Sequence, residues 1–244
     1  MKITQATIIT ARSSSSRYPG KILENIKRGI KSIDILILRA KKVGLPIILA
    51  TSNNKEDDKL CKYINKKYKI IIFRGSKNNK IKRWLDCFKK YHIKKACMVD
   101  GDDLCFDFNI YKESLKKNGL VACNKNIITG IFTNTITFKS LEKIYKATKN
   151  NKDTEMIEPF IKKSKIKKNY IKINTLFLNK KIRLTFDYKE DWELLKKLLF
   201  IYKITEKTEN FVKYLLKNKR ISSINYFREE NWKNNQLNKI NLIR

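Results

Sequence analysis

Short apolar runs alternate with helical segments through the first hundred residues of the chain. Four apolar runs have the length of buried strands, and they cover residues 6–10, 46–50, 70–73 and 96–99. Between them, apolar residues recur at helical spacing over 29–42, over 56–68 and around 81–88. This alternation predicts an α/β fold, in which a mostly parallel sheet is covered by helices on both faces in three α/β/α layers.

The pattern becomes looser after residue 107. We expect β structure over 130–138 and 182–186, and helices over 141–147, 154–161, 191–199 and 211–218. The last 15 or so residues are rich in Asn and Lys and are expected to be partly mobile. Because there is no internal repeat and no long linker, we expect one compact domain over 1–205 and a helical C-terminal extension over 206–244.

A loop of small hydroxyl residues and cations follows the first expected strand. It runs from Ala11 to Lys21 and reads A-R-S-S-S-S-R-Y-P-G-K. Parallel sheets bind ligands at the carboxyl ends of their strands. Small residues let backbone N–H groups approach an anion, and arginine and lysine neutralise it. The Pro19-Gly20 turn fixes where Lys21 points. The loop therefore predicts phosphate binding.

Acidic residues are scarce in this chain, so their positions are informative. There are 23 of them against 56 basic residues. Four aspartates lie within 100–107, at the end of the expected strand 96–99, and Asp187 ends the expected strand 182–186. Two carboxylates from separate strand ends can converge on one hard cation such as Mg²⁺. Alternatively, the acids of 100–107 cap a helix or form an Asx turn.

The formal net charge of +33 raises the possibility of a nucleic-acid partner. The lysines, however, are spread over nearly every segment together with isoleucine and asparagine, a composition typical of an AT-rich genome, which favours solvated surface lysines over a specific nucleic-acid site. No apolar run approaches the ~20 residues of a membrane span. Five scattered cysteines without a C-x-x-C pair, one histidine and the absence of a signal peptide indicate a reduced, cytoplasmic protein without zinc.

Taken in order, the short motifs of the chain resemble those of one enzyme family. The motifs are A-R-x-x-S-x-R-x-P-G-K at 11–21, A-T-S at 50–52, F-R-G-S at 73–76, G-D at 101–102 and R-L-T-x-D-x-x-x-D at 183–191. The chain resembles cytidylyltransferases of the spore-coat polysaccharide biosynthesis type, which are related to CMP-Kdo and CMP-sialic acid synthetases. The resemblance implies a Rossmann-like, nucleotide-diphospho-sugar transferase-like fold, with 1–205 as the nucleotidyltransferase domain.

The same resemblance implies a reaction and its residues. CMP would pass from CTP to a sugar, expected to be an acidic one, with Mg²⁺ as cofactor and pyrophosphate as product, for surface polysaccharide or glycan synthesis. Arg12 and Lys21 would be catalytic, and Asp102 and Asp187 would hold the metal. The residues expected to bind the nucleotide are Ala11, Ser13, Ser15, Ala50, Thr51, Arg74, Arg83 and Gly101. Relatives also suggest a homodimer.

Several positions depart from the family pattern on the expected sugar side. Leu104 stands where the family has proline, Met156 replaces a histidine and Asn134 replaces an acid. Arg74 and Arg83 could equally be structural ion-pair partners. Three other functions stay open: a pyrophosphorylase that uses UTP or GTP, a non-catalytic nucleotide-binding relic, and a polyanion- or RNA-binding protein.

Overall fold

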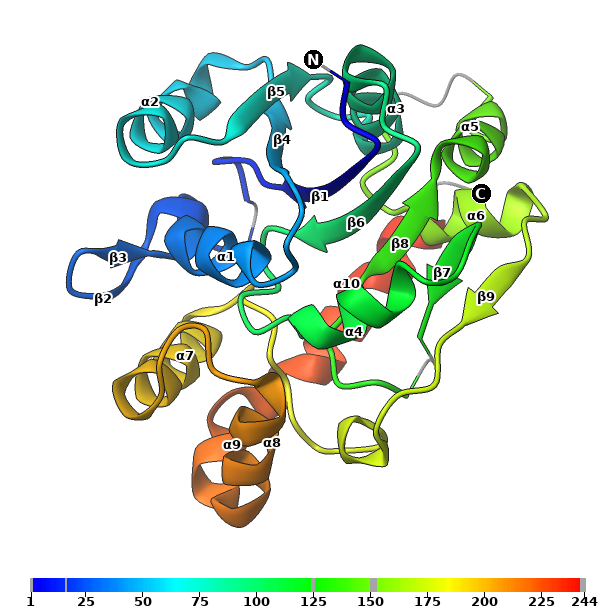
Figure 1. The fold of residues 1–244 in the computed structure, drawn as a ribbon. Coiled ribbons are helices and arrows are strands. Elements are labelled where there is room, and N and C mark those ends of the chain that lie inside the picture. The colour runs from blue at the N-terminus through cyan, green and yellow to red at the C-terminus, as the bar shows by residue number, and fades with distance from the viewer. Residues whose placement is uncertain (1, 16, 124–125, 150–152, 242–244) are drawn as a thin grey trace.

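A seven-stranded sheet with the order β5-β4-β1-β6-β8-β7-β9 forms the centre of the molecule (Figure 1). This computed structural model describes residues 2–15, 17–123, 126–149 and 153–241, so Ser16 of the serine-rich loop and residues 242–244 lie outside it. The strands are β1 Gln5–Thr10, β4 Ile47–Ser52, β5 Ile71–Gly75, β6 Lys95–Asp100, β7 Leu120–Ala122, β8 Asn134–Thr137 and β9 Lys168–Tyr170.

The four strands expected in the first half of the chain are confirmed. β5, β4, β1 and β6 pair in parallel, and the residues of β1, β4 and β6 are mostly buried, whereas only Phe73 is buried in the edge strand β5. β8 is antiparallel to both β6 and β7, whereas β9 pairs in parallel with β7. The mostly parallel sheet of an α/β fold, as predicted, is therefore present.

The chain changes direction across the sheet between β1 and β6. β1, β4 and β5 lead outward to one edge, and β6 then returns to the opposite side of β1. The loops that leave the carboxyl ends of β1 and β6 bound a crevice of the kind that binds ligands in such sheets. Gly101 allows these loops to touch, because its N–H donates to the Thr10 carbonyl (2.8 Å) and an added Cβ would lie 2.9 Å from the Ala11 Cβ.

Helices cover both faces of the sheet and complete the three layers (Figure 1). One core cluster joins the sheet to α3 Lys80–Tyr91, α5 Phe138–Lys146 and α6 Glu158–Lys163. A second core cluster joins the other face to α1 Ser32–Lys41, α2 Asp58–Lys67, α4 Phe108–Ser114, α7 Lys189–Ile201 and α8 Thr208–Lys217. A small hairpin of β2 Asn25–Lys27 and β3 Ile30–Lys31 precedes α1. Short 3-10 turns cover Lys21–Leu23, Lys55–Asp57 and Thr175–Phe177.

The C-terminal helices pack onto the same core as the rest of the chain. α8 is followed by α9 Lys219–Tyr226 and α10 Arg228–Asn241. Arg39 of α1 is fully buried and donates hydrogen bonds to the carbonyls of Ile204 and Glu206 and to the Thr208 hydroxyl. This guanidinium stabilises the start of the expected extension against α1.

Some expected elements take another form. The segment 182–186 is not a strand and makes a single bridge, between Arg183 and Thr129. Its backbone N–H groups donate to two different loops, from Leu184 to Thr129 and from Phe186 to Asp102, so it does not pair along one strand. Only 134–137 of the expected β segment 130–138 is a strand. The helix expected over 154–161 begins at Glu158, with Pro159 in its first turn, where proline is favoured. Most of the expected mobile terminus is helix α10.

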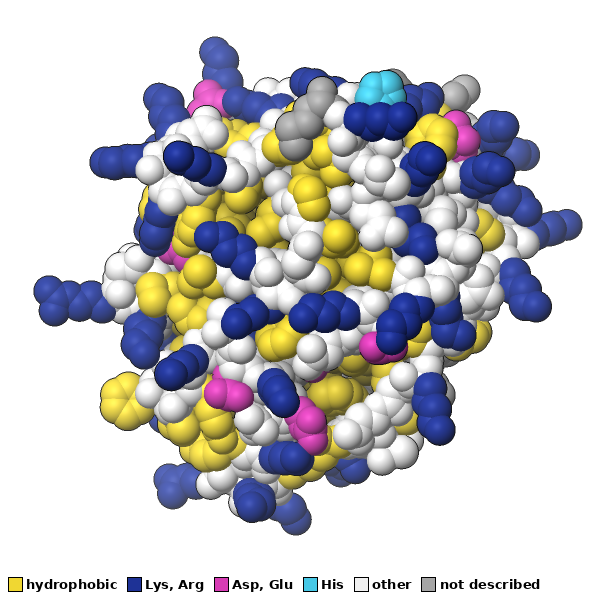
Figure 2. Space-filling view, in the orientation of Figure 1, with side chains coloured by type: hydrophobic (Ala, Val, Ile, Leu, Met, Phe, Trp, Pro, Cys, Tyr) yellow, Lys and Arg dark blue, Asp and Glu magenta, His cyan; other side chains and the backbone are white. Residues whose placement is uncertain are grey.

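Lysine and arginine side chains are distributed widely over the surface. Figure 2 shows them scattered across one face, with no continuous stripe or patch. This distribution agrees with solvated surface lysines. Among the described helices, none combines the length and the apolar character needed to cross a membrane.

Candidate active site

One buried carboxylate, that of Asp57, holds the loop after β1 in place. The backbone N–H of Ser13 donates to Oδ1 of Asp57 (2.6 Å). Oδ2 of Asp57 accepts from the Thr51 hydroxyl (2.8 Å) and from the backbone N–H and hydroxyl of Ser52. Burial opposes ionisation of Asp57, but the hydrogen bonds from Ser52, Ser13 and Thr51 outweigh it, and its pKa lies below the usual range. Asp57 thereby ties the loop to the end of β4.

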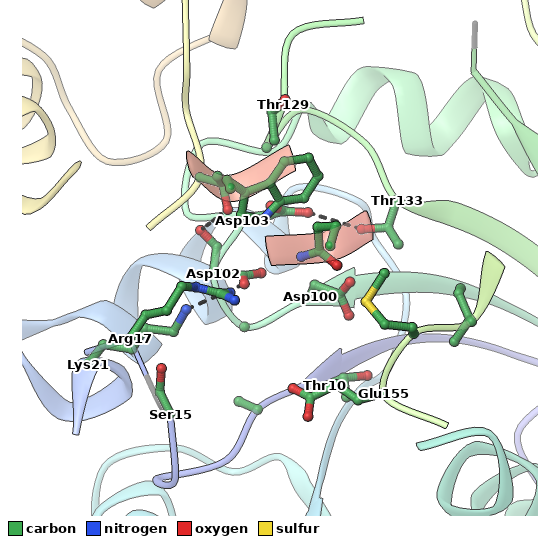
Figure 3. Close-up of a pocket in the computed structure, with 18 of the residues that line it drawn as sticks. Thr10, Ser15, Arg17, Lys21, Asp100, Asp102, Asp103, Thr129, Thr133 and Glu155 are labelled. Atoms are coloured by element: carbon green, nitrogen blue, oxygen red, sulfur yellow. Dashed lines mark hydrogen bonds and ion pairs between the residues drawn. The ribbon is translucent and has the colours of Figure 1, made fainter. Parts of the chain in front are cut away.

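Lys21, which follows the Pro19-Gly20 turn, lies among the acids of the site. Gly20 has a left-handed φ of 75°, a conformation for which glycine is suited. The Lys21 ammonium donates to Asp187 Oδ1 (2.8 Å) and to the Phe186 carbonyl (2.6 Å), and it lies 3.4 Å from Asp102 Oδ2 (Figure 3). Burial alone would lower the pKa of Lys21, but these two carboxylates raise it above its usual range. Lys21 is therefore a fixed, buried cation.

Asp187 is fully buried and bonded to three cations. Oδ1 accepts from Arg17 (2.6 Å) and Lys21 (2.8 Å), and Oδ2 accepts from Arg183 (3.2 Å). Burial would raise the pKa of this carboxyl, yet Lys21 and Arg17 lower it to about 2. Asp187 and Asp102 are the two residues expected to hold the metal, and the Lys21 ammonium lies within ion-pair distance of both. Metal binding by Asp187 would require one of these cations to release an oxygen.

Three carboxylates gather at the end of β6. Each of Asp100, Asp102 and Asp103 has an oxygen within 4.8 Å of the others. Burial first, and then the neighbouring negative charges, raise the pKa of Asp103. Burial also raises the pKa of Asp102, although the Lys21 charge opposes it. Lys80 pairs with Asp100 (2.6 Å) and Lys21 lies 3.4 Å from Asp102. Clustered carboxylate oxygens suit a hard divalent cation, so this donor set fits Mg²⁺. Of the three, only Asp102 was predicted as a ligand.

Asp107, the fourth aspartate of the sequence cluster, has a structural role. Its carboxylate accepts from the backbone N–H groups of Asn109 and Ile110 and so caps α4. Here the capping alternative from the sequence is correct.

Two of the predicted arginines meet at the rim of the cavity. Arg12 donates to the Lys77 carbonyl (2.6 Å) and pairs with Glu155 (2.8 Å). Arg83 is buried and donates to the carbonyls of Ser76 (2.6 Å) and Lys77 (3.2 Å). Burial and the Arg12 charge lower the pKa of Arg83 to about 10. Both arginines line the cavity, and both are held by backbone carbonyls.

Three of the residues expected to bind nucleotide do not line the cavity in this structure. Arg74 is bound to Asp58 (2.6 Å) and to the carbonyls of Ser52 and Asn54, which is the structural ion-pair role that the sequence left open. Ala50 and Thr51 lie in β4, below the loop. The expected residues that do line the cavity are Ala11, Arg12, Ser13, Ser15, Lys21, Arg83, Gly101 and Asp102.

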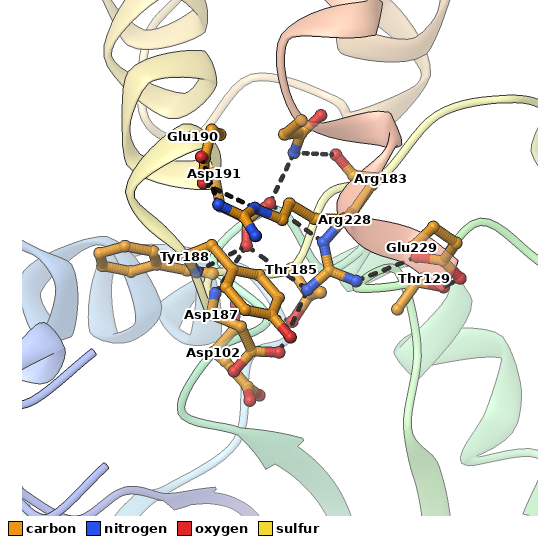
Figure 4. A network of polar contacts seen from close by, with 12 residues as sticks. Asp102, Thr129, Arg183, Thr185, Asp187, Tyr188, Glu190, Asp191, Arg228 and Glu229 are labelled. Carbon is orange, nitrogen blue, oxygen red and sulfur yellow. Dashed lines mark hydrogen bonds and ion pairs between the residues drawn. The ribbon is translucent and has the colours of Figure 1, made fainter. Parts of the chain in front are cut away.

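A buried ionic network lies behind Asp187 (Figure 4). The Arg183 guanidinium bonds to Asp191 (3.0 Å), to Glu229 (3.0 Å) and to Asp187. Asn225 donates to Asp191 (2.8 Å) and to the Arg183 carbonyl. The R-L-T-x-D-x-x-x-D motif contains Arg183 and Asp191, but nothing in the motif indicates that the two residues bond to each other. The only feature of the sequence that could have pointed to Glu229 is that it is an acid in a C-terminal region rich in Lys and Asn.

These elements enclose one large cavity of about 1410 Å³. One end is formed by the loop after β1, Lys80, Arg83 and the acids after β6. The other end is formed by the segments 126–133 and 179–182 and by α10. Ligand pockets commonly hold ~300–1,000 Å³, so this cavity is larger than a typical pocket for one small ligand.

Known proteins share both this fold and this sequence pattern. A cytidylyltransferase family model matches residues 6–224. An uncharacterized protein of Methanocaldococcus jannaschii is 30% identical over 228 residues, which cover 89% of this chain and 93% of that protein.

Several solved structures share the fold at lower sequence identity. A cytidylyltransferase from Leptospira borgpetersenii superposes with a TM-score of 0.80 at 23% identity, covering 90% of this chain and 97% of that one. CMP:2-keto-3-deoxy-manno-octonic acid synthetase complexed with CTP gives 0.60 at 14% identity, with 81% and 99% covered. The Anaerococcus prevotii 4-diphosphocytidyl-2C-methyl-D-erythritol synthase gives 0.58 at 15% identity, with the same coverage. By the family model that matches residues 6–224, the chain belongs to the cytidylyltransferase family.

Proposed function

We propose that the protein transfers CMP from CTP to a sugar hydroxyl and releases pyrophosphate. The hydroxyl oxygen forms a bond to the α-phosphorus, the bond from that phosphorus to the bridging oxygen of the β-phosphate breaks, and the hydroxyl proton is lost to water. Such a reaction needs positioning and charge neutralisation more than covalent catalysis. The observation that carries the proposal is the Lys21 ammonium, held beside Asp102 and Asp187 at the crevice between β1 and β6.

Each part of the site has a place in this reaction. Residues 11–15 line the cavity, and their backbone N–H groups, other than that of Ser13, which is bonded to Asp57, would bind phosphate oxygens. Lys21 and Arg12 would offset the charge that develops on the triphosphate. Asp102 would hold Mg²⁺ together with its neighbours in the acid cluster, and Asp187 is a proposed second ligand. When bound there, Mg²⁺ supplies charge stabilisation to the phosphates. In the same proposal the acceptor is an acidic sugar of surface polysaccharide or glycan synthesis.

A direct assay tests the reaction. The protein is incubated with Mg²⁺, a panel of sugars and CTP, UTP, GTP or ATP in turn, and pyrophosphate is measured. We expect release with CTP alone, and no release when EDTA replaces Mg²⁺. Release with UTP or GTP instead would indicate a different pyrophosphorylase. CTP-dependent thermal stabilisation without any release would indicate a nucleotide-binding relic, and salt-sensitive RNA binding without nucleotide stabilisation would indicate a polyanion-binding protein. Light scattering would test the expected homodimer.

A further inference from the structure

Helix α10 closes the end of the cavity that lies away from the serine-rich loop. Glu229, Trp232, Lys233 and Gln236 all line the cavity. Spacings of three and four residues place these side chains on one face of a helix. In Figure 3, α10 (faint red) passes close to Asp103 and Thr133. The C-terminal helix is thus part of the site, although the sequence suggested a partly mobile terminus.

The start of α10 is held by the buried network that also contacts Asp187 (Figure 4). Glu229 is only 6% exposed; its Oε2 accepts from Arg183 (3.0 Å) and its Oε1 accepts from the Thr129 hydroxyl (2.8 Å). Arg228 pairs with Glu190 of α7 (2.7 Å). Because Arg183 bonds both Asp187 and Glu229, α10 is fixed relative to the acids of the site. The start of α10 is therefore held in one position beside the cavity.

The chemistry of the α10 end of the cavity differs from that of the phosphate end. The half-buried Trp232 ring lies 5.8 Å from the Arg183 guanidinium and also borders the cavity. Lys180 and Lys181, in the segment 179–182, also line the cavity, and neither forms an ion pair with another described residue. Lys233 lies 3.7 Å from Glu229, whose charge is already shared with Arg183. This end of the cavity is therefore aromatic and positively charged.

We propose that α10 forms the acceptor subsite, where Trp232 packs against the sugar ring and Lys180 and Lys233 bind an anionic group on it. This assignment depends on the nucleotidyl transfer proposed above. An aromatic surface with a few placed charges is typical of pockets that bind and orient small polar ligands. The anionic group is a carboxylate or a phosphate, since the same lysines suit either. A sugar held there would lie between α10 and the acid cluster.

The test separates the acceptor from the nucleotide. Pyrophosphate release is measured with CTP, Mg²⁺ and, in turn, 2-keto-3-deoxy-manno-octonic acid, N-acetylneuraminic acid, glucuronic acid, glucose 6-phosphate, glucose and mannose. The variants are Lys180→Gln/Lys233→Gln and Trp232→Ala. The matched control is Lys62→Gln/Lys66→Gln, which removes two exposed lysines of α2 that do not line the cavity.

We expect turnover only with anionic sugars. Comparing the sugars that carry a carboxylate with glucose 6-phosphate shows which anionic group the site binds. The double lysine variant should raise the KM for that sugar about tenfold or more, as expected for loss of charge-assisted hydrogen bonds. Its KM for CTP should stay within about twofold of wild type. In the Lys62→Gln/Lys66→Gln control, the KM for the sugar and the KM for CTP should both stay within the same range. Trp232→Ala should also raise the sugar KM.

Three results would overturn the assignment: an unchanged sugar KM in the variants, turnover with the neutral sugars, or no turnover with any sugar while CTP still stabilises the protein against heat. If CTP neither reacts nor stabilises the protein, the proposed function itself fails, which is a different result.

Discussion

The ammonium of Lys21 lies 2.8 Å from Oδ1 of Asp187, across 166 residues of sequence. The same oxygen accepts from Arg17 at 2.6 Å. A lysine in the loop after the first strand and an aspartate just before α7 thus form one buried ion pair. This ion pair neutralises Asp187 and presents a single ammonium toward the cavity.

Lys21→Ala is expected to abolish most of the activity while the protein stays folded. Removing one fixed donor that stabilises a transition state costs roughly 10²–10³ in kcat. Asp187 would keep Arg17 and Arg183, so its buried charge stays compensated. Pyrophosphate release and thermal unfolding are measured in parallel, with Lys62→Ala as the control. Turnover within a few-fold of wild type would remove Lys21 from the catalytic residues.

Asp57→Ala is expected to lower stability and to weaken CTP binding. It removes the shared acceptor of Ser13, Thr51 and Ser52, and leaving buried donors without partners costs about 3 kcal/mol in total. Urea unfolding gives the change in free energy, and the KM for CTP reports the loop. Asp86→Asn, on the surface of α3, serves as the control. A destabilised variant with an unchanged KM for CTP would show that the loop does not need this anchor.

Gly101→Ala is expected to separate the loops after β1 and β6. The new Cβ would lie 2.9 Å from both the Thr10 carbonyl oxygen and the Ala11 Cβ, closer than such atoms normally approach. The backbone must shift to relieve this overlap, at a cost of about 1–3 kcal/mol. Thermal unfolding and the KM for CTP should both change. If both match wild type, the two loops do not require this close contact.

Asp34 gives the protein a pH-dependent stability that is independent of the site. Its carboxylate accepts from the Lys31 N–H, from Tyr63, from Tyr68 and from Lys67. Burial would raise the pKa of Asp34, but these hydrogen bonds lower it below the usual value. A lowered pKa stabilises the folded state above the unfolded pKa of about 3.9, and this contribution is lost as the pH falls through the folded pKa.

Asp34→Asn should therefore be less stable than wild type at pH 7 by about 2 kcal/mol, because hydrogen bonds to a charged group are lost. The difference should shrink as the pH falls from 5 to 3, where wild type loses the same contribution. Urea unfolding of both proteins at pH 7, 5 and 3 measures it. A difference that stays constant over this range would contradict the role given to the ionised carboxylate.

Local patterns accounted for the elements of the first half of the chain. The apolar run 6–10 and the helical spacing of Ile33, Ile37 and Ala40 predicted β1 and α1, because strand and helix periodicity depend on neighbouring residues. The apolar run 182–186 was misleading, because its backbone hydrogen bonds are made to distant loops and not to a sheet.

By itself, the sequence determined the fold class and located the loop 11–21 and the acids after β6, since each is encoded in a short run of residues. Only the tertiary structure decided that Asp57 holds the loop, that Asp187 is covered by three cations, and that α10 closes the cavity through Glu229. Each of these depends on contacts between residues far apart in the chain. A buried charge is stable only where folding brings its partners to it, and no local pattern records which partners those will be.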